Sequence, residues 1–351
     1  MRQGKGLLIS ALLLTQVLGL TTIWSTFPEL FFTQLSFVLV GTIIILLLSK
    51  VDLTLFFSLS TVFYVVSLLL LAVTLMVGKN IRGSVRWIDL GFFSLQTSEI
   101  VKPLLAIFYS SYLAKFQNLS WKGLFRFLFL AMLPVVLIAF QPDLGSALTL
   151  FFLPMALLVF SGQIKKILLV GMVSLLIFIP LESKLLKPYQ RQRIETFINP
   201  YQDPQGSGYN VIQSTIAVGS GKILGKGVKL GTQSHLNFLP ERHTDFIFAS
   251  YVEEFGLLGA LVLFAAYSVI FNYSLINLRR FKERRLTLLS LSTFLIFFFQ
   301  FVVNIGMNLG IMPVTGITLP LFSYGGSSLL SFAILIGLQL RQLDLIAPFE
   351  I

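Results

Sequence analysis

The sequence contains no cysteine and only two histidines, His235 and His243. Disulfides and thiolate chemistry are excluded, and a structural zinc site, which usually needs four Cys or His ligands, is not expected. Charged residues are also scarce, at 12% of the chain, whereas a soluble domain averages about 25%. No part of the chain is left for a soluble domain of ordinary size, so we expect one transmembrane domain over residues 1–351.

Hydrophobic residues make up 56% of the 351 residues. Apolar runs of about 20 residues, the length that spans a bilayer, recur along the chain. We predict an all-α polytopic membrane protein with about ten transmembrane helices and one long extracytoplasmic loop, 182–246. The predicted segments are Leu7–Phe27, Phe31–Ser49, Thr54–Val77, Ser98–Ala114, Leu124–Phe140, Gly145–Gly162, Ile164–Leu181, Ile247–Ile276, Leu286–Leu309 and Ile317–Leu340.

The placement of the basic residues predicts the orientation. The net charge of +11 is distributed between the apolar runs, so a membrane surface suits this chain better than nucleic acid. Cytoplasmic loops are enriched in Lys and Arg. With the N-terminus inside, the short outer loops hold only Lys79, Arg82 and Arg86 as basic residues. We therefore place both termini in the cytoplasm and 182–246 outside.

Polar residues between the third and fourth segments form the first candidate site. Arg82 and Arg86 can bind a phosphate or pyrophosphate through bidentate hydrogen bonds, and anchoring in lipid headgroups explains them equally well. Glu99 and Lys102 are spaced i,i+3, so they can pair on one helix face with either a functional or a structural role. Further along, Asp143 either caps the helix that it begins or pairs with Lys102.

Small and polar residues interrupt the last apolar segment between Pro313 and Ser328. Such residues, which include Ser323 and Gly325, indicate close helix packing or a broken helix. Asn304 and Asn308 precede them with i,i+4 spacing, so they share a helix face and can form hydrogen bonds to neighbouring helices.

The long loop 182–246 carries too many apolar residues for simple disorder, and we expect parts of it to lie on the membrane surface. It contains no match to a P-loop. Asp245 stands directly before a membrane helix, and a role as the cap of that helix explains it without any catalytic function. The candidate site residues in the loop are Arg191, Arg193, Glu241, Arg242, His243 and Asp245.

Together these stretches resemble the SEDS family (shape, elongation, division and sporulation), which includes RodA and FtsW proteins. The resemblance covers almost the whole chain. Its most specific parts are Leu239–Ala249 with Glu253–Gly256, and Ser323–Gly326. Arg242 before His243 is more similar to RodA than to FtsW proteins. Two positions depart from the family pattern: Thr97 stands where Pro is usual, and Pro103 follows Lys102. They leave open the exact start and path of the fourth helix, not the family.

The resemblance implies a glycosyltransferase that polymerises lipid II at the outer face of the bacterial cytoplasmic membrane during cell-wall elongation. The donor glycan is carried on undecaprenyl pyrophosphate, and the acceptor is the sugar 4-hydroxyl of another lipid II. The implied partners are a class B penicillin-binding protein and other membrane proteins of the elongation complex. The catalytic acidic residue of the family corresponds to Asp245.

This reaction converts an α-linked diphosphate donor into a β-linked glycan, so it inverts the sugar carbon. Inverting glycosidases use a carboxylate base, and Asp245 is the candidate here. Cations can stabilise the leaving pyrophosphate, and a divalent ion such as Mg²⁺ is possible, although no other cofactor is expected. The candidate cations are Arg82, Arg86, Lys102, Arg191, Arg193 and Arg242. The supporting residues are Glu99, Asp143, Glu241, His243, Ser323 and Gly325.

Two other functions compete with this prediction, a lipid II flippase and a non-catalytic scaffold for a transpeptidase. A transporter needs coupling residues near the membrane midplane on several helices, whereas Glu99, Glu253 and Glu254 are all expected near the outer side. A scaffold does not require basic outer loops together with Asp245. Polymer formation from lipid II by the purified protein distinguishes the enzyme from both.

Overall fold

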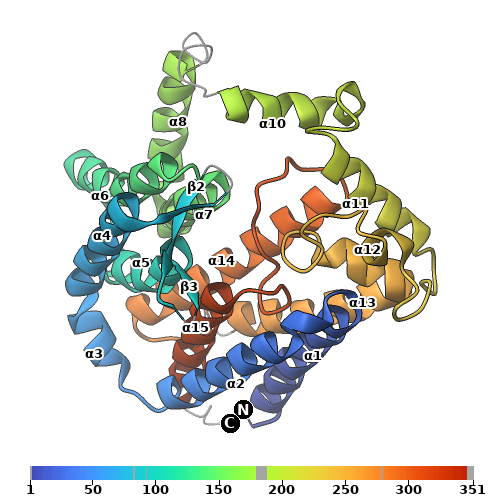
Figure 1. Cartoon of the computed structure of the whole chain (residues 1–351). Helices are drawn as coiled ribbons and strands as arrows, with labels where there is room; N and C mark the ends of the chain where they lie inside the picture. Colours follow the sequence, from blue (N-terminus) through green and yellow to red (C-terminus); the bar gives the residue numbers. More distant parts are fainter. Residues whose placement is uncertain are drawn as a thin grey trace.

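Helices make up most of the computed structural model of the protein, which describes residues 2–81, 84–91, 93–178, 188–276, 278 and 280–345. Arg82, a predicted pyrophosphate-binding residue, lies outside these described residues. The helices, which are labelled in Figure 1, are α1 (Arg2–Thr26), α2 (Phe31–Leu48), α3 (Leu53–Ser58), α4 (Ser60–Val77), α5 (Thr97–Ala114), α6 (Trp121–Phe140), α7 (Leu144–Leu158), α8 (Ile164–Phe178), α10 (Pro188–Ile198), α11 (Tyr209–Ser220), α12 (Thr232–His235), α13 (Ile247–Ile276), α14 (Arg284–Asn308) and α15 (Gly326–Asp344).

Within the described residues, eight helical stretches are long and apolar enough to cross a membrane. The prediction of an all-α, multi-pass membrane protein is therefore confirmed. Two predicted segments, which correspond to α7 and α8, form one apolar stretch over Leu144–Met172. A π-helical turn, η2 (Val159–Gln163), interrupts this stretch where Gly162 has a φ of +80°. Glycine takes this left-handed conformation at little steric cost, so the helix can change direction there.

Helix α5 is a central helix that carries charged residues. It packs against α4, α14 and α15, and the side chains of Glu99 and Lys102 on it are both buried. Lys102 Nζ donates to Glu99 Oε1 in an ion pair within this helix, as their i,i+3 spacing predicts. Because an unpaired buried charge is costly, the pairing lets α5 occupy the interior of the bundle.

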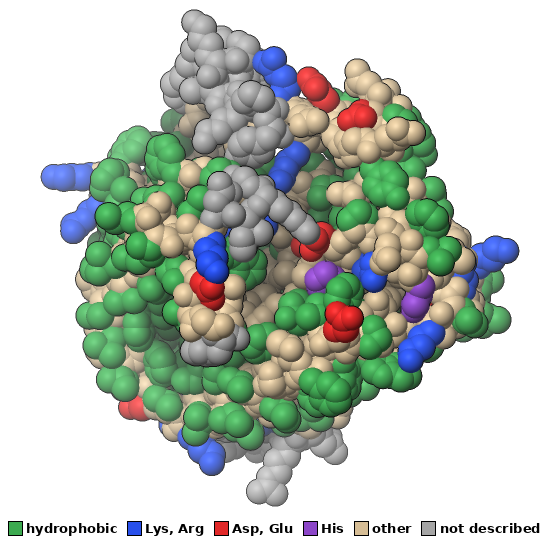
Figure 2. Space-filling model, in the orientation of Figure 1, with side chains coloured by type: hydrophobic (Ala, Val, Ile, Leu, Met, Phe, Trp, Pro, Cys, Tyr) green, Lys and Arg blue, Asp and Glu red, His purple; other side chains and the backbone are tan. Residues whose placement is uncertain are grey.

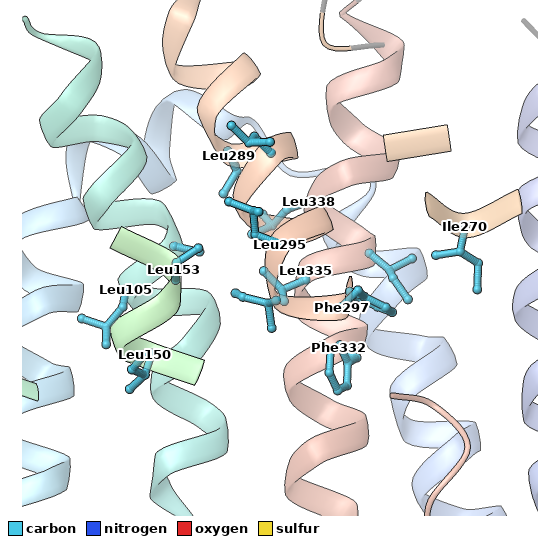
Figure 3. Packing of buried hydrophobic residues seen from close by; sticks show 14 of the residues in the cluster. Leu105, Leu150, Leu153, Ile270, Leu289, Leu295, Phe297, Phe332, Leu335 and Leu338 are labelled. Atoms are coloured by element: carbon cyan, nitrogen blue, oxygen red, sulfur yellow. The ribbon is translucent and has the colours of Figure 1, made fainter. Parts of the chain in front are cut away.

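The hydrophobic core lies between α5, α7, α14 and α15. Figure 3 shows side chains of this core, including Leu105, Leu150 and Phe297, pointing into the space between the helices. In the apolar stretch of α15, 83% is buried inside the protein, whereas only 17% is buried in the apolar stretch that contains α2. We infer that α14 and α15 form the centre of the bundle, while α2 and its neighbours present apolar side chains to lipid.

The last predicted segment, Ile317–Leu340, begins too early, because residues 311–325 are not helical and α15 starts at Gly326. Pro313 and Pro320 disfavour a helix over this stretch. Gly316 adopts a φ of +73° and Leu321 a φ of +63°, which are outside the helical region. The small and polar residues of this stretch therefore form a non-helical segment that reaches towards the loop before α13.

A small antiparallel sheet joins α4 to α5, and the sequence analysis did not anticipate it. It contains β1 (Lys79–Ile81), β2 (Ser84–Asp89) and β3 (Ser94–Gln96) in the order β1-β2-β3. The pair Trp87↔Gln96 sets the register of β2 against β3. The backbone N–H of Gln96 donates to Ser327 Oγ of α15 at 2.9 Å, which attaches the sheet to the centre of the bundle.

Candidate functional site

A cavity of about 520 Å³ opens between the sheet, the long loop and the non-helical segment before α15. Its walls come from β2, α10, α11, residues 241–246 and residues 312–316. Figure 2 shows a hollow near the middle of this face, with acidic and histidine side chains at its edge. Segments distant in sequence thus meet at one place, and Arg86, Arg193, Glu241 and Asp245 all line it.

The main chain of Asp245 is fixed by two amides of α14. Asn304 Nδ2 and Asn308 Nδ2 each donate to the carbonyl oxygen of Asp245 at 3.0 Å. Asn308 Oδ1 also accepts a hydrogen bond from Ala249 N in the first turn of α13, at 3.0 Å. The two asparagines, spaced i,i+4 on α14, therefore form hydrogen bonds to a neighbouring segment, as predicted. They hold the backbone of Asp245, while its side chain lines the cavity.

The segment before α15 holds the residues that precede Asp245. Ser323 Oγ donates to the carbonyl oxygen of Thr244 at 2.8 Å, and the backbone N–H of Tyr324 donates to the carbonyl oxygen of His243 at 2.9 Å. Gln34 of α2 accepts from the backbone N–H of Gly325 at 3.2 Å. Ser323 thus holds the backbone before Asp245, Gly325 attaches its own segment to α2, and neither residue lines the cavity.

The electrostatic environment makes Asp245 a stronger base than an exposed aspartate. Burial against the cavity wall raises the pKa of its carboxyl from the ordinary value of 3.8 to about 6, and the nearby Glu241 carboxylate adds to this rise. Arg86 and, more weakly, Arg193 oppose the rise by favouring the charged form. A carboxyl with a pKa near 6 is ionised at neutral pH and accepts a proton more readily than an ordinary one.

Asp143 connects Arg86 to the bundle. Its carboxylate accepts from Ser146 N at 3.2 Å and so caps α7, as one of the two sequence alternatives predicts. Asp143 Oδ2 accepts from Ser98 Oγ at 3.0 Å. Arg86 Nη1 lies 3.6 Å from Asp143 Oδ1. The other alternative, a pair with Lys102, is wrong, because Lys102 pairs with a glutamate of its own helix.

Several predicted substrate contacts lie outside the cavity. Lys102 is buried within α5, and Arg191 is exposed on α10. The Nε of Arg242 donates to the carbonyl oxygen of Thr26 at 3.2 Å, and its guanidinium lies 5.2 Å from the Phe27 ring centre.

The ring of His243 does not line the cavity either. It packs between Phe27 and Tyr324, with ring centres 4.9 and 5.7 Å away. Arg242 and His243 therefore attach the loop to α1, and neither is placed to contact a ligand in this cavity.

The cavity also contains polar residues that the sequence analysis missed. Thr196 of α10 donates to Ser207 Oγ at 2.8 Å, and both line the cavity together with Asn210 of α11. Gly316 lies opposite Asp245, and a Cβ atom at this position would come within 3.4 Å of Asp245 Oδ2. The glycine keeps space beside the carboxylate, and the left-handed φ of +73° is a second reason for glycine there.

Few side chains of this cavity could act as ligands of a metal ion. Among the described residues, no group of three or more His, Asp or Glu side chains is arranged to hold one. Glu241 and Asp245 are two carboxylates on the same cavity wall. Mg²⁺ often binds through one or two carboxylates together with substrate phosphates, so these residues fit an ion that arrives with its substrate.

Comparison with known sequences identifies close relatives over most of the chain. The sequence profile of the FtsW/RodA/SpoVE cell cycle proteins matches residues 7–344. The chain is 38% identical over 296 residues to the peptidoglycan glycosyltransferase MrdB of Escherichia coli (strain K12), covering 83% of this chain and 79% of the relative. It is 37% identical over 304 residues to the probable peptidoglycan glycosyltransferase FtsW of Aliivibrio salmonicida, covering 83% and 74%.

Solved structures show the same fold. A chain from a peptidoglycan synthase complex, studied for the coordination of polymerization and crosslinking, has a TM-score of 0.83 and 33% sequence identity. The match covers 96% of this chain and 97% of that one. The rod shape determining protein RodA of Thermus thermophilus has a TM-score of 0.72 and 27% identity, with 96% of each chain covered.

Proposed function

The chain belongs to the FtsW/RodA/SpoVE family of SEDS proteins and is a peptidoglycan glycosyltransferase, and we propose that it polymerises lipid II with Asp245 as the base. The observation that carries this proposal is one cavity that holds the Asp245 carboxylate together with Arg86 and Arg193. A base for the acceptor and cations for a pyrophosphate are the two requirements of an inverting transfer from a diphosphate donor.

In the proposed reaction, the sugar 4-hydroxyl of the acceptor lipid II gives its proton to Asp245. The acceptor oxygen attacks the anomeric carbon of the donor sugar, and the bond from that carbon to the pyrophosphate oxygen breaks. Undecaprenyl pyrophosphate leaves with the electron pair. The Asn304 and Asn308 contacts to the Asp245 backbone support the base in a fixed position, which favours proton transfer.

The leaving pyrophosphate is assigned to Arg86 and Arg193. Guanidinium groups bind phosphate oxygens through two parallel hydrogen bonds, and Asp143 lies beside Arg86 to orient it. Mg²⁺, held by Glu241 or Asp245 with the substrate, would add further positive charge to the leaving group. Arg191, Lys102 and Arg242 have no direct part in this proposal, because they lie away from the cavity.

We propose that this cavity lies at the outer face of the membrane, with both termini in the cytoplasm. The scarcity of basic residues in the short loops on the cavity side supports this orientation. The related peptidoglycan synthase complex combines polymerization with crosslinking, which supports a class B penicillin-binding protein as the partner of this chain. The resemblance to RodA proteins supports a role in cell-wall elongation.

The direct test is incubation of the purified protein with labelled lipid II, followed by gel separation of the products. We expect a ladder of glycan polymers, with stronger signal when the transpeptidase partner is added. A flippase would move labelled lipid II across liposome membranes without producing polymer. A scaffold would produce neither polymer nor transport. Transport without polymer, or the absence of both, from folded protein would refute the proposed reaction.

A further inference from the structure

A second cavity lies at the end of the bundle opposite to Asp245. It has a volume of about 390 Å³ and opens between η2 and the connection from α13 to α14. Helix α13 starts two residues after Asp245, and α14 returns to Asn308, whose side chain donates to the carbonyl oxygen of Asp245. The connection between the two helices must therefore lie at the far end of both, away from the site described above.

The wall of this second cavity combines an apolar part with a polar part. The apolar part consists of Phe160, Leu278, Phe281, Leu288 and Leu291. The polar part consists of Ser161, Lys282, Arg284 and Thr287. Phe160 is 63% exposed on the outside of the bundle, so the apolar part continues onto the surface that faces lipid. A phospholipid has the same division, with acyl chains beside a charged phosphate.

The two cations of this cavity are not neutralised by the acidic residue between them. Glu283 separates Lys282 from Arg284 in sequence, but its carboxylate accepts from Arg285 Nε at 2.6 Å. Among the residues that the structure describes, neither Lys282 nor Arg284 forms an ion pair. Their charges are therefore available to an anion that enters the cavity.

The start of α14 provides a further attraction for an anion. Glu283 is the N-cap residue, but its side chain makes no hydrogen bond to the backbone N–H groups of the first turn. These N–H groups are the positive end of a 25-residue helix and favour an anion at this place. Across the cavity, Ser161 Oγ is buried and has no hydrogen-bond partner within the described part of the chain. A phosphate group there would satisfy the hydroxyl and the helix end together.

We propose that this second cavity binds the phosphate of an anionic phospholipid, with an acyl chain along Phe160 and Leu288. In the orientation proposed above, the lipid belongs to the cytoplasmic leaflet. Basic pockets between transmembrane helices on that side are suited to anionic headgroups. A free phosphate shares the charge but leaves the apolar wall of the cavity without a partner, so the lipid is the better fit.

The test measures binding of fluorescent phosphatidylglycerol to the purified full-length protein in neutral detergent. The double variant Lys282→Gln/Arg284→Gln is compared with Lys115→Gln/Lys122→Gln. The control removes the same charge from exposed lysines at the same end of the bundle, where Lys115 follows α5 and Lys122 lies in the first turn of α6. We expect binding to weaken about thirtyfold in the cavity variant and to change less than about threefold in the control.

Three outcomes would overturn the proposal. These are equal weakening in both double variants, equal binding of phosphatidylcholine, or displacement of the fluorescent lipid by inorganic phosphate as effectively as by unlabelled phosphatidylglycerol. Thermal unfolding in neutral detergent first shows that each variant is folded. Should the cavity double variant fail to fold, each single change, Lys282→Gln or Arg284→Gln, should weaken binding about fivefold, and unchanged binding in both would also overturn it.

Discussion

Asp245 precedes α13 and Glu253 lies within its first two turns, yet their surroundings are opposite. The Glu253 carboxylate is fully buried and accepts from Lys226 Nζ at 2.8 Å, Gln233 N at 2.9 Å and Ser234 N at 3.0 Å. The Asp245 carboxylate lines an open cavity, and the α14 asparagines bond to its backbone.

This comparison separates two uses of an acidic residue at the end of a membrane helix. The Glu253 carboxylate accepts its hydrogen bonds from the loop around α12, and these bonds fix this outer segment in place. Asp245 is held through its backbone, and its carboxylate keeps a surface that a substrate can reach. We therefore assign a chemical role to Asp245 and a structural role to Glu253, so substitutions of the two residues should have different consequences.

The largest expected effect is on the polymerisation rate of Asp245→Asn. Asparagine preserves the size of the side chain but cannot accept the acceptor proton, and a positioned base contributes about 10²–10⁴-fold. We expect a loss in that range, measured as polymer formed from labelled lipid II by folded protein. Near-normal polymer would remove Asp245 from the reaction and leave it as a helix cap.

The next effect concerns the cations that share the cavity with Asp245. The double variant Arg86→Ala/Arg193→Ala should reduce polymerisation at limiting lipid II about 100-fold, because each change removes a charge-assisted contact to the pyrophosphate. Arg191→Ala is the matched control, since Arg191 lies on the same helix as Arg193 but is exposed. Equal losses in control and double variant would show that the arginines act through general charge.

Glu253→Gln should affect stability more than chemistry. The change removes the charge that binds Lys226 and places an amide N–H₂ near backbone donors, which costs about 2 kcal/mol of unfolding free energy. This lies below the usual range for a broken buried pair, about 3–5 kcal/mol, because the Lys226 side chain is 27% exposed. Thermal unfolding in detergent measures it, and an unchanged melting temperature would contradict the structural role.

The smallest effect is a pH dependence that belongs to Asp245. Its pKa of about 6 means that the base form is lost as the pH falls through 6, so the rate at pH 5 should be about tenfold below its plateau. Glu241→Gln removes the repulsion that helps to raise this pKa, so we expect the acidic fall in the polymerisation rate to move to lower pH. If the rate of this variant falls over the same pH range as that of the unchanged protein, Asp245 is not the titrating group.

The sequence predicted those features that depend on local spacing. The Glu99–Lys102 pair, the Asp143 cap and the Asn304–Asn308 contacts each follow from residues near one another on a helix. The sequence could not separate Arg193 from Arg191, because only the packing of α10 decides which of them faces the cavity. Nor could it show that β2 brings Arg86 to Asp143, since pairing of such short strands depends on distant segments.

The most direct measurement compares Asp245→Asn and Glu253→Gln in the same experiment. Polymer formed from labelled lipid II is measured per folded molecule, and thermal unfolding is measured on the same samples. We predict that Asp245→Asn keeps the melting temperature and loses polymer, while Glu253→Gln lowers the melting temperature and keeps most polymer per folded molecule. The reverse pattern, with polymer retained by stable Asp245→Asn and lost by stable Glu253→Gln, would contradict the assignment of the base.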